Sequence, residues 1–447
     1  MNINYGVECI VCKSKINLRM QAGRIEKNLI RFNCPKCGIP INIELNLNNK
    51  CSGKKIENSI ENANFVDKFQ EAKYSIQCSS EFFTSKNILN PFNNENVEAS
   101  EEIFSPFIQA SKFFGSDNLG LFANHCYLIS ECIYNINVFE RVNNLYYSKS
   151  SYFISHINEV LEENNINITV EDTEISKFEG IYYFNIMYLS RFLKIGEFSS
   201  INKEILKDID KLKKDNEKEF NKMVNYFGDN KKIEYYERKI IKTINSYIKK
   251  IKYLMPSIGL EYLREDITKD EIYKKYTMRT STFEDIRNIY LEVYENFIDI
   301  YDFIASLNNI KYRGSYEKFN LLKDIEGVPN KIKKNDKLKV NNLLDFKLLD
   351  KGLKLYYVKD KCDEGFNKYM PNLESYLRNS LGHENWSYDD ENQIIKFENK
   401  FSSKSNEHSL LEYANECYNM FSRLLAIYKI LMDIKNSYLK NAIKSNK

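Results

Sequence analysis

An arginine, an asparagine and a histidine lie close together late in the chain and could carry out proton transfer at a phosphodiester. They are Arg378, Asn379 and His383, in the stretch SYLRNSLGHENW at residues 375–386. An arginine fork binds a phosphodiester through two hydrogen bonds, a histidine exchanges protons near neutral pH, and an amide orients either group. Together they suffice for RNA cleavage without a metal ion, in which the neighbouring 2′-hydroxyl attacks the phosphorus.

A short helix is expected to position these three groups. Leu377 and Leu381 are four residues apart, as on the buried face of a helix, and Gly382 is typical of a helix end. Asn379 and His383 share another face, which the long arginine arm can also reach. His383 would then lie at the C-terminal turn, where a helix stabilises a cationic imidazole. A structural alternative is a buried or capping histidine, beside an arginine that pairs with a neighbouring acid.

The three residues resemble the motif of a known family. Arg378-Asn379-x3-His383 is similar to the Arg-x4-6-His motif of the HEPN superfamily, and residues 386–397 predict a hairpin behind it. The resemblance covers roughly the last 200 residues. It implies a helical bundle with ribonuclease activity, as in many toxins and anti-phage defence effectors. Since the chain holds one such motif, it also implies a homodimer that joins two motifs, with RNA as the substrate.

The resemblance implies a role for each residue. His383 would act as general base or acid, Arg378 would stabilise the negative phosphorane, and Asn379 would orient His383 or the phosphate, as expected of a metal-independent endoribonuclease. The alternatives are a non-catalytic nucleic-acid-binding or dimerising sensor protein, and an enzyme that transfers a nucleotide to a target. The sequence does not identify a regulatory or phage-derived partner. Asp285 and Arg287, with Asn288, are conceivable polar partners on a predicted neighbouring helix.

Four cysteines near the N-terminus have the spacing of a zinc site. Cys9-x2-Cys12 and Cys34-x2-Cys37 are separated by 21 residues, and two such pairs supply four thiolates for tetrahedral Zn²⁺. Strand-like runs occur at residues 16–20, 29–32 and 39–47. The pattern predicts a zinc ribbon whose metal is structural, because so small a unit lacks a sufficient core. Its basic residues either contact nucleic acid or form a solvated face: Lys13, Lys15, Arg19, Arg24, Lys27, Arg31 and Lys36.

The composition narrows the class of protein. A hydrophobic share of 43% with 28% charged residues fits a folded domain protein, and the scarcity of glycine (15) and proline (7) favours helices. The net charge of +3 requires any RNA site to be a local patch. No secretory signal or membrane span is evident, so we expect a cytoplasmic protein whose ten cysteines serve metal binding before disulfides. Phosphate-binding, dinucleotide, metalloprotease and serine-hydrolase motifs are missing.

Helical periodicity runs through most of the chain after residue 119. Helices are expected at residues 119–142, 153–163, 178–194, 203–226, 231–254, 282–307 and 408–436. Between the last two, a run of lysines at 331–339 precedes an expected strand at 353–358. We therefore predict a mainly α protein with three parts: a small β zinc ribbon (1–50), a mixed to helical middle region (51–228) and a HEPN-like helical bundle (229–447) with an insertion at about 308–370.

Overall fold

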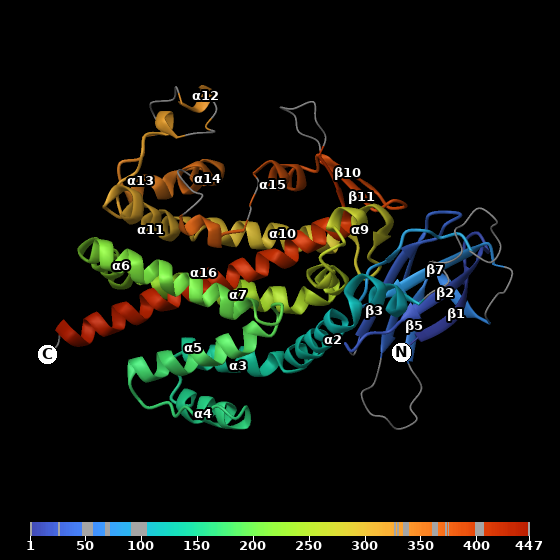
Figure 1. The fold of residues 1–447 in the computed structure, drawn as a ribbon, viewed down its shortest axis with the longest axis horizontal. Coiled ribbons are helices and arrows are strands. Elements are labelled where there is room, and N and C mark those ends of the chain that lie inside the picture. Colours follow the sequence, from blue (N-terminus) through green and yellow to red (C-terminus); the bar gives the residue numbers. More distant parts are fainter. Residues whose placement is uncertain are drawn as a thin grey trace. The chain divides into compact units, whose positions relative to one another are not determined.

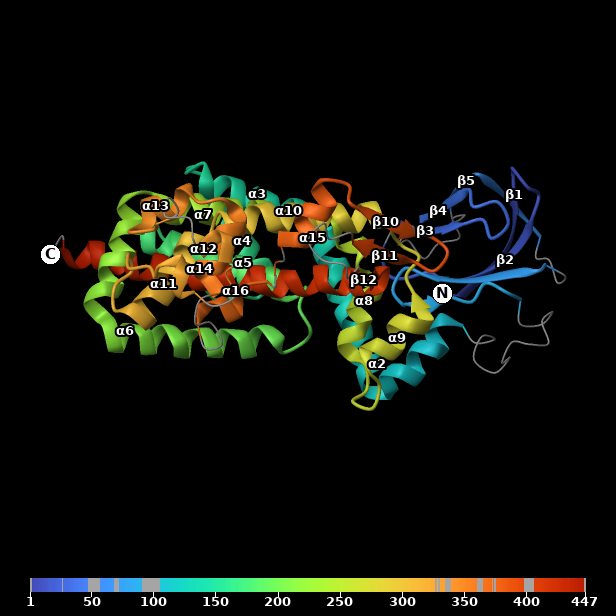
Figure 2. The same ribbon diagram turned by 90° about the horizontal axis from the view of Figure 1, so that it is seen from above.

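The computed structural model describes residues 2–25, 27–46, 57–67, 72–90, 105–325, 328, 330–333, 339–359, 365–371, 373, 375–397 and 406–445. The chain forms two compact units, each assembled from separate stretches of sequence. The first unit comprises Met1–Ile133, Ile248–Leu291 and Tyr376–Asn419, and the second comprises Tyr134–Tyr247, Glu292–Ser375 and Met420–Lys447. Figure 1 shows the elements coloured along the chain, and Figure 2 shows the same ribbon from above.

Two β-sheets form the N-terminal part of the first unit. The first sheet has the order β6-β1-β2-β7 and consists of Ala63–Val66, Asn2–Cys9, Lys15–Gln21 and Tyr74–Ser79. The second has the order β3-β4-β5 and consists of Lys27–Asn33, Pro40–Asn46 and Glu57–Glu61. Buried and less buried residues alternate along β3 and β4, as in strands that turn one face to a core. β7 pairs with β2 in parallel, and the other pairs are antiparallel.

One apolar core serves both sheets. It combines Val7, Ile16 and Leu18 of the first sheet with Ile30 and Ile43 of the second, all at most 2% exposed. Cys9 and Cys34 belong to the same core. Burial of these side chains, at roughly 25 cal/mol per Å² of apolar surface, stabilises the packing of one sheet on the other.

The rest of the first unit is helical, with two small sheets. Its helices include α2 (Pro106–Tyr134), α9 (Lys269–Lys275), α15 (Ser375–Gly382) and the first parts of α10 (Phe283–Ile298) and α16 (Leu410–Ser445). β8 (Thr84–Ser85) pairs with β9 (Tyr276–Thr277). β10 (Trp386–Asp389), β11 (Ile394–Phe397) and β12 (Asn406–Ser409) form an antiparallel sheet. α2 has a kink at Gly115, whose φ of 73° suits glycine.

Helices make up the second unit among the residues described. They include α3 (Ile136–Tyr147), α4 (Phe153–Glu163), α5 (Glu174–Ser190), α6 (Glu197–Asp229), α7 (Lys232–Lys250), α11 (Tyr301–Arg313), α13 (Leu343–Leu348) and α14 (Lys351–Lys359). A buried polar network links three of them. Asn185 of α5 donates hydrogen bonds to Asn143 of α3 and to the Tyr428 hydroxyl of α16, at 3.1 and 2.9 Å. Such satisfied buried contacts fix how the helices pack.

The predicted fold class was wrong in two respects, although helices do predominate at 61% against 15% strand. The β structure is not a small ribbon, because β5, β6, β7 and β8 extend it to Ser85. The C-terminal part is not a separate helical bundle either, because it carries the β10-β11-β12 sheet and α15 belongs to the same unit as the N-terminal sheets. Pairing across long sequence separations, which local periodicity does not report, accounts for the difference.

Two element predictions also need correction. The expected strand at 353–358 is part of helix α14, and Tyr357 packs edge-on against the rings of Phe319 and Phe346. So short an apolar run cannot distinguish a strand from a buried helical turn. The expected helix at 282–307 is divided into two helices, α10 and α11, which are separated by residues 299–300. Most of the lysine run at 331–339 lies outside the described residues.

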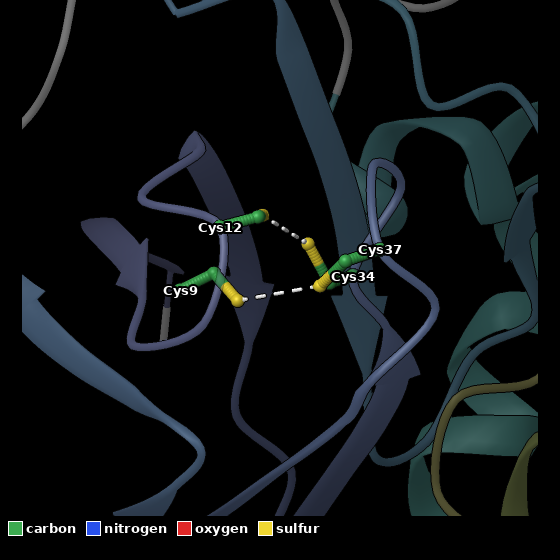
Figure 3. Close-up of side chains that lie close together, drawn as sticks. All are labelled: Cys9, Cys12, Cys34 and Cys37. Atoms are coloured by element: carbon green, nitrogen blue, oxygen red, sulfur yellow. Dashed lines mark hydrogen bonds between the residues drawn. The ribbon is translucent and has the colours of Figure 1, made fainter.

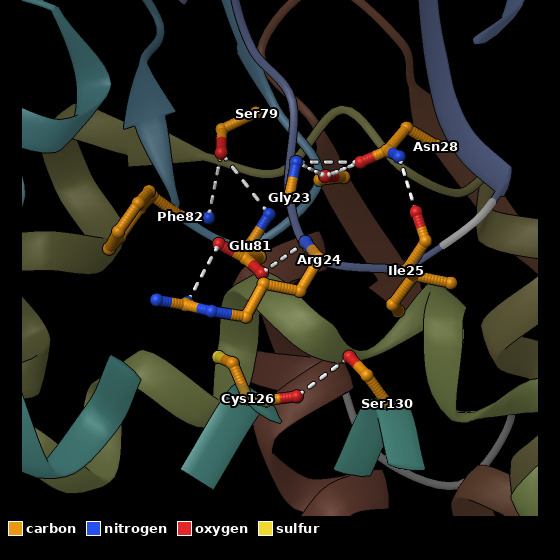
Figure 4. Close-up of polar contacts among 10 residues, drawn as sticks. Gly23, Arg24, Ile25, Asn28, Ser79, Glu81, Phe82, Cys126 and Ser130 are labelled. Atoms are coloured by element: carbon orange, nitrogen blue, oxygen red, sulfur yellow. Dashed lines mark hydrogen bonds and ion pairs between the residues drawn. The ribbon is translucent and has the colours of Figure 1, made fainter. Parts of the chain in front are cut away.

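A buried corner joins two loops of the first unit (Figure 4). Glu81 is 3% exposed and accepts a hydrogen bond of 2.7 Å from the Arg24 backbone N–H, while the Arg24 guanidinium lies 3.8 Å from its other oxygen. The loop before β3 lies so close to the Glu81 side chain that a Cβ on Gly23 would be 2.5 Å from Glu81 Cγ. Burial raises the pKa of Glu81, and Arg24 offsets part of that effect.

Glu81→Gln is expected to change how stability depends on pH. Because the folded-state pKa of Glu81 is raised, its contribution to stability is fully present below the unfolded pKa of about 4.3 and is lost as pH rises through the folded value. The variant has no such loss, so its free energy of unfolding should improve relative to wild type between pH 4 and pH 7. Urea unfolding at several pH values measures this difference. Parallel pH profiles for the two proteins would contradict it.

Candidate active site and metal centre

The four N-terminal cysteines lie close together at one end of the core between the two sheets (Figure 3). Cys9 ends β1, Cys12 lies in the turn after it, Cys34 follows β3, and Cys37 lies in the turn between β3 and β4. The Sγ atoms of Cys9 and Cys37 are 3.7 Å apart, and those of Cys12 and Cys34 are 3.5 Å apart. All four sulfurs lie within 4.8 Å of one another. The grouping predicted from spacing is therefore present.

This cysteine cluster is compatible with a zinc site. Four thiolates at a Zn–S distance of about 2.3 Å form a tetrahedron with edges of about 3.8 Å, close to the separations observed. The Ser14 hydroxyl lies 3.2 Å from Cys12 Sγ and lowers the pKa of that thiol to about 6. Burial instead raises the pKa of Cys34 to about 12. A bound cation would favour the thiolate form of both.

Helix α15 carries the candidate catalytic residues in the first unit. Leu377 and Leu381 are buried, as the periodicity predicts, whereas Asn379 and His383 are exposed and Arg378 is half-buried. The His383 N–H donates to the Asn379 carbonyl at 2.9 Å, and the Asn385 N–H donates to the Ser380 carbonyl at 2.8 Å. His383 thus lies at the end of the last turn, with its imidazole accessible to a large ligand.

The helix ends in a left-handed residue, but that residue is not the glycine. Glu384 has a φ of 56°, and the bond from Asn385 to Ser380 spans five residues, which is the Schellman pattern of helix termination. Gly382 instead lies beside the Arg378 side chain. A Cβ there would lie 3.6 Å from Nη1 of Arg378, whose guanidinium therefore lies over the residue just before His383. Arg378 Nη1 also lies 3.4 Å from Oδ1 of Asn379.

A second arginine holds the end of this helix in place. Arg287 of α10 donates from Nη2 to the Leu381 carbonyl at 2.9 Å and pairs with Glu284 at 2.7 Å. Its guanidinium also lies 5.9 Å from the ring centroid of Trp386, at the start of β10. A cation at a helix C-terminus is favourable, so Arg287 both caps and anchors α15. Of the three polar partners suggested on α10, Asp285 instead pairs with Arg31.

Arg287→Gln is expected to loosen α15 without unfolding the unit. It removes a charge-assisted hydrogen bond to Leu381, which is worth about 1.5–3 kcal/mol. The amide hydrogens of the last turn of α15, His383 among them, should exchange correspondingly faster with solvent. Hydrogen-exchange mass spectrometry measures this. Lys274→Gln, on the exposed surface of α9, is the control. Unchanged protection of α15 would show that Arg287 does not anchor the helix.

Sequence reasoning missed a second cluster of potential metal ligands. His408 of β12 and Glu412 and Glu416 of α16 place their donor atoms within 4.8 Å of one another, and their regular four-residue spacing could have revealed them. Glu412 has a structural role, because it accepts a hydrogen bond from the Ser409 N–H at 3.2 Å while its own N–H donates to Ser409 Oγ at 3.0 Å. That pair is a capping box for α16.

Comparison with models of protein families, with curated proteins and with solved structures finds no match for this chain. Within the described residues, none of the helices combines the length and apolar character that crossing a membrane requires.

Proposed function

We propose that this protein is a metal-independent endoribonuclease whose active site is formed by Arg378, Asn379 and His383. The observation that carries the proposal is the arrangement at the end of α15. The imidazole is exposed, and the guanidinium is folded over Gly382 toward the same turn. A polymer can reach an exposed helix end, and a phosphodiester there would meet a cation and a proton-transfer group together.

In the proposed reaction the ribose 2′-hydroxyl attacks the adjacent phosphorus. His383 removes the hydroxyl proton or protonates the departing 5′-oxygen, and Arg378 stabilises the charge on the phosphorane. Asn379, whose amide oxygen lies 3.4 Å from the arginine, keeps the guanidinium oriented. The products would be a 2′,3′-cyclic phosphate and a free 5′-hydroxyl. Uncontrolled cleavage of cellular RNA would make the protein a toxin, as expected of a HEPN-type defence effector in the cytoplasm.

One histidine cannot be base and acid in the same step, which leads us to propose a homodimer. Two copies of α15 would face one cleft, so that His383 of one chain and His383 of the other divide the two proton transfers. The exposure of this helix end leaves it accessible for such a pairing.

We also propose that Cys9, Cys12, Cys34 and Cys37 hold one structural Zn²⁺. The ion would join the turn after β1 to the turn after β3 and so tie the two sheets together at one end. Its chemistry would be confined to that role, since four protein ligands leave no open coordination position.

The direct test is incubation of the purified full-length chain with total RNA in EDTA, followed by mapping of the new ends. Cleavage that leaves 2′,3′-cyclic phosphates is the expected result. Circular dichroism before and after a brief exposure to EDTA checks that loss of zinc has not unfolded the protein. RNA that is bound but stays intact would instead identify a nucleic-acid-binding protein, and a labelled product without shortened RNA would identify a nucleotide transferase.

A further inference from the structure

The second unit contains a cavity that the proposed nuclease activity does not use. Its volume is about 310 Å³, at the lower end of the range typical of small-molecule sites. The ends of α3 and α6 border it, and α4, α5, α7 and α16 complete its lining. None of its lining residues belongs to the first unit, which carries α15 and the cysteine cluster.

Two lysines at the cavity have an unusual backbone conformation. Lys149 follows α3 and Lys231 follows α6, and each has a φ of 54°. This left-handed position after a helix is normally occupied by glycine or asparagine, because a side chain there is strained. The same left-handed conformation follows α15 at Glu384, so it serves to end a helix, and the helix dipole favours the positive charge of a lysine there. What distinguishes Lys149 and Lys231 is that both line the cavity.

The ammonium groups of Lys149 and Lys231 are the charges with which the cavity can bind a ligand. Among the described residues, neither Lys149 nor Lys231 forms a hydrogen bond or ion pair through its ammonium group. The other charged residues of the lining have partners within the protein: Lys177 lies between Asp172 and Glu174, Glu234 pairs with Arg238, and Lys435 pairs with the fully buried Glu237. The cavity therefore has two positive charges to offer an anionic ligand.

The remaining wall is apolar and partly aromatic. Phe153, Ile233 and Leu439 line it beside the rings of Tyr146 and Tyr438. The Tyr438 ring lies directly on the backbone of α6, where a Cβ on Gly228 would come within 2.3 Å of it. The Tyr438 hydroxyl donates to Asp229 at 3.1 Å, which fixes the ring from its other end. A ring held in this way presents a rigid surface to a flat group.

We propose that this cavity binds a nucleoside phosphate, with the phosphate at Lys149 and Lys231 and the base against the aromatic wall. Nucleoside phosphates combine a compact anion with a flat, largely apolar ring system, which are the two features the lining matches. Lysine binds phosphate as a point charge, and aromatic rings stack on bases of any identity. The proposal does not depend on the nuclease activity, because the two sites share no residue.

Isothermal titration calorimetry of the full-length protein with ATP and with AMP tests the proposal. Saturable binding is expected, with adenosine and inorganic phosphate each binding at least about tenfold more weakly because each supplies only one of the two features. Lys149→Gln and Lys231→Gln should each weaken binding by about tenfold or more, since each removes a charge-assisted contact. Lys207→Gln, an exposed lysine elsewhere on α6, and Arg378→Ala should leave the affinity unchanged.

Lys149→Gly separates ligand binding from a structural role. Glycine relieves the left-handed strain, so the melting temperature should stay level or rise while nucleotide affinity falls by at least about tenfold. A lysine that served only the helix dipole would give a lower melting temperature and no change in affinity. Absence of binding at millimolar ATP and AMP, or binding that the lysine variants do not weaken, would overturn the proposal.

Discussion

Replacing His383 by alanine is expected to lower the rate of RNA cleavage by at least about 10²-fold, because general acid–base groups contribute about 10²–10⁴-fold. The fold should persist, since the side chain is exposed and the contact of His383 with Asn379 uses only backbone atoms. The free energy of unfolding should therefore stay within about 0.5 kcal/mol of wild type. Initial rates on a fluorescent RNA oligonucleotide give the comparison.

The matched control is His156→Ala, which removes a histidine of the second unit that contacts Arg141 and Glu159. Its cleavage rate should equal that of wild type. Adding an excess of His383→Ala chains to wild-type chains then tests the dimer. If the two His383 rings divide the proton transfers, a mixed dimer holds only one of them, and the cleavage rate should fall below that of the same amount of wild type alone. Equal rates for wild type and His383→Ala would rule out the proposed site.

Cys34→Ser is expected to abolish zinc binding and to destabilise the N-terminal sheets. Cys34 belongs to their shared core, so its loss removes both a metal ligand and a buried contact. Structural zinc contributes about 10–16 kcal/mol in peptides that fold around it. Even a loss of about 3 kcal/mol would lower the melting temperature of a unit of this size by roughly 6–12 °C.

Elemental analysis measures the zinc content of Cys34→Ser, and thermal unfolding measures its loss of stability. The control is Cys132→Ala, which changes a buried cysteine outside the cluster and should keep one zinc per chain. Chelation of wild-type protein should reproduce the instability of Cys34→Ser. A zinc-free wild-type protein with an unchanged melting temperature would exclude a structural metal.

Local signals in the sequence predicted the surroundings of the candidate site well. The spacing of Leu377 and Leu381 fixes the buried face of α15, and the hairpin of β10 and β11 follows from alternating residues after Trp386. Cysteine spacing likewise grouped four thiols that come from two separate turns. In each case, the residues that come together are close in sequence or have the spacing that a metal site requires.

Contacts between distant segments could not be predicted in this way. β7 pairs with β2 across more than fifty residues, and although its sequence YSIQCS alternates between apolar and polar residues, that pattern does not indicate which strand it pairs with. Arg287 contacts Leu381 from a different helix, so the sequence around either residue does not predict the contact. Helix α15 does end at Gly382, as predicted, but the left-handed residue after it is Glu384, which takes that conformation despite its Cβ. Tertiary packing overrides the local preference there.

The pairing of β8 with β9 has a consequence for how the protein is made. Thr84 and Thr277 lie opposite each other in this strand pair, yet 192 residues separate them in the sequence. At typical ribosomal speeds of about 5–20 residues per second, the first partner waits roughly 10–40 s for the second to emerge. During that interval β8 lacks its partner strand, so chaperone binding to this intermediate should help to determine the yield of native protein.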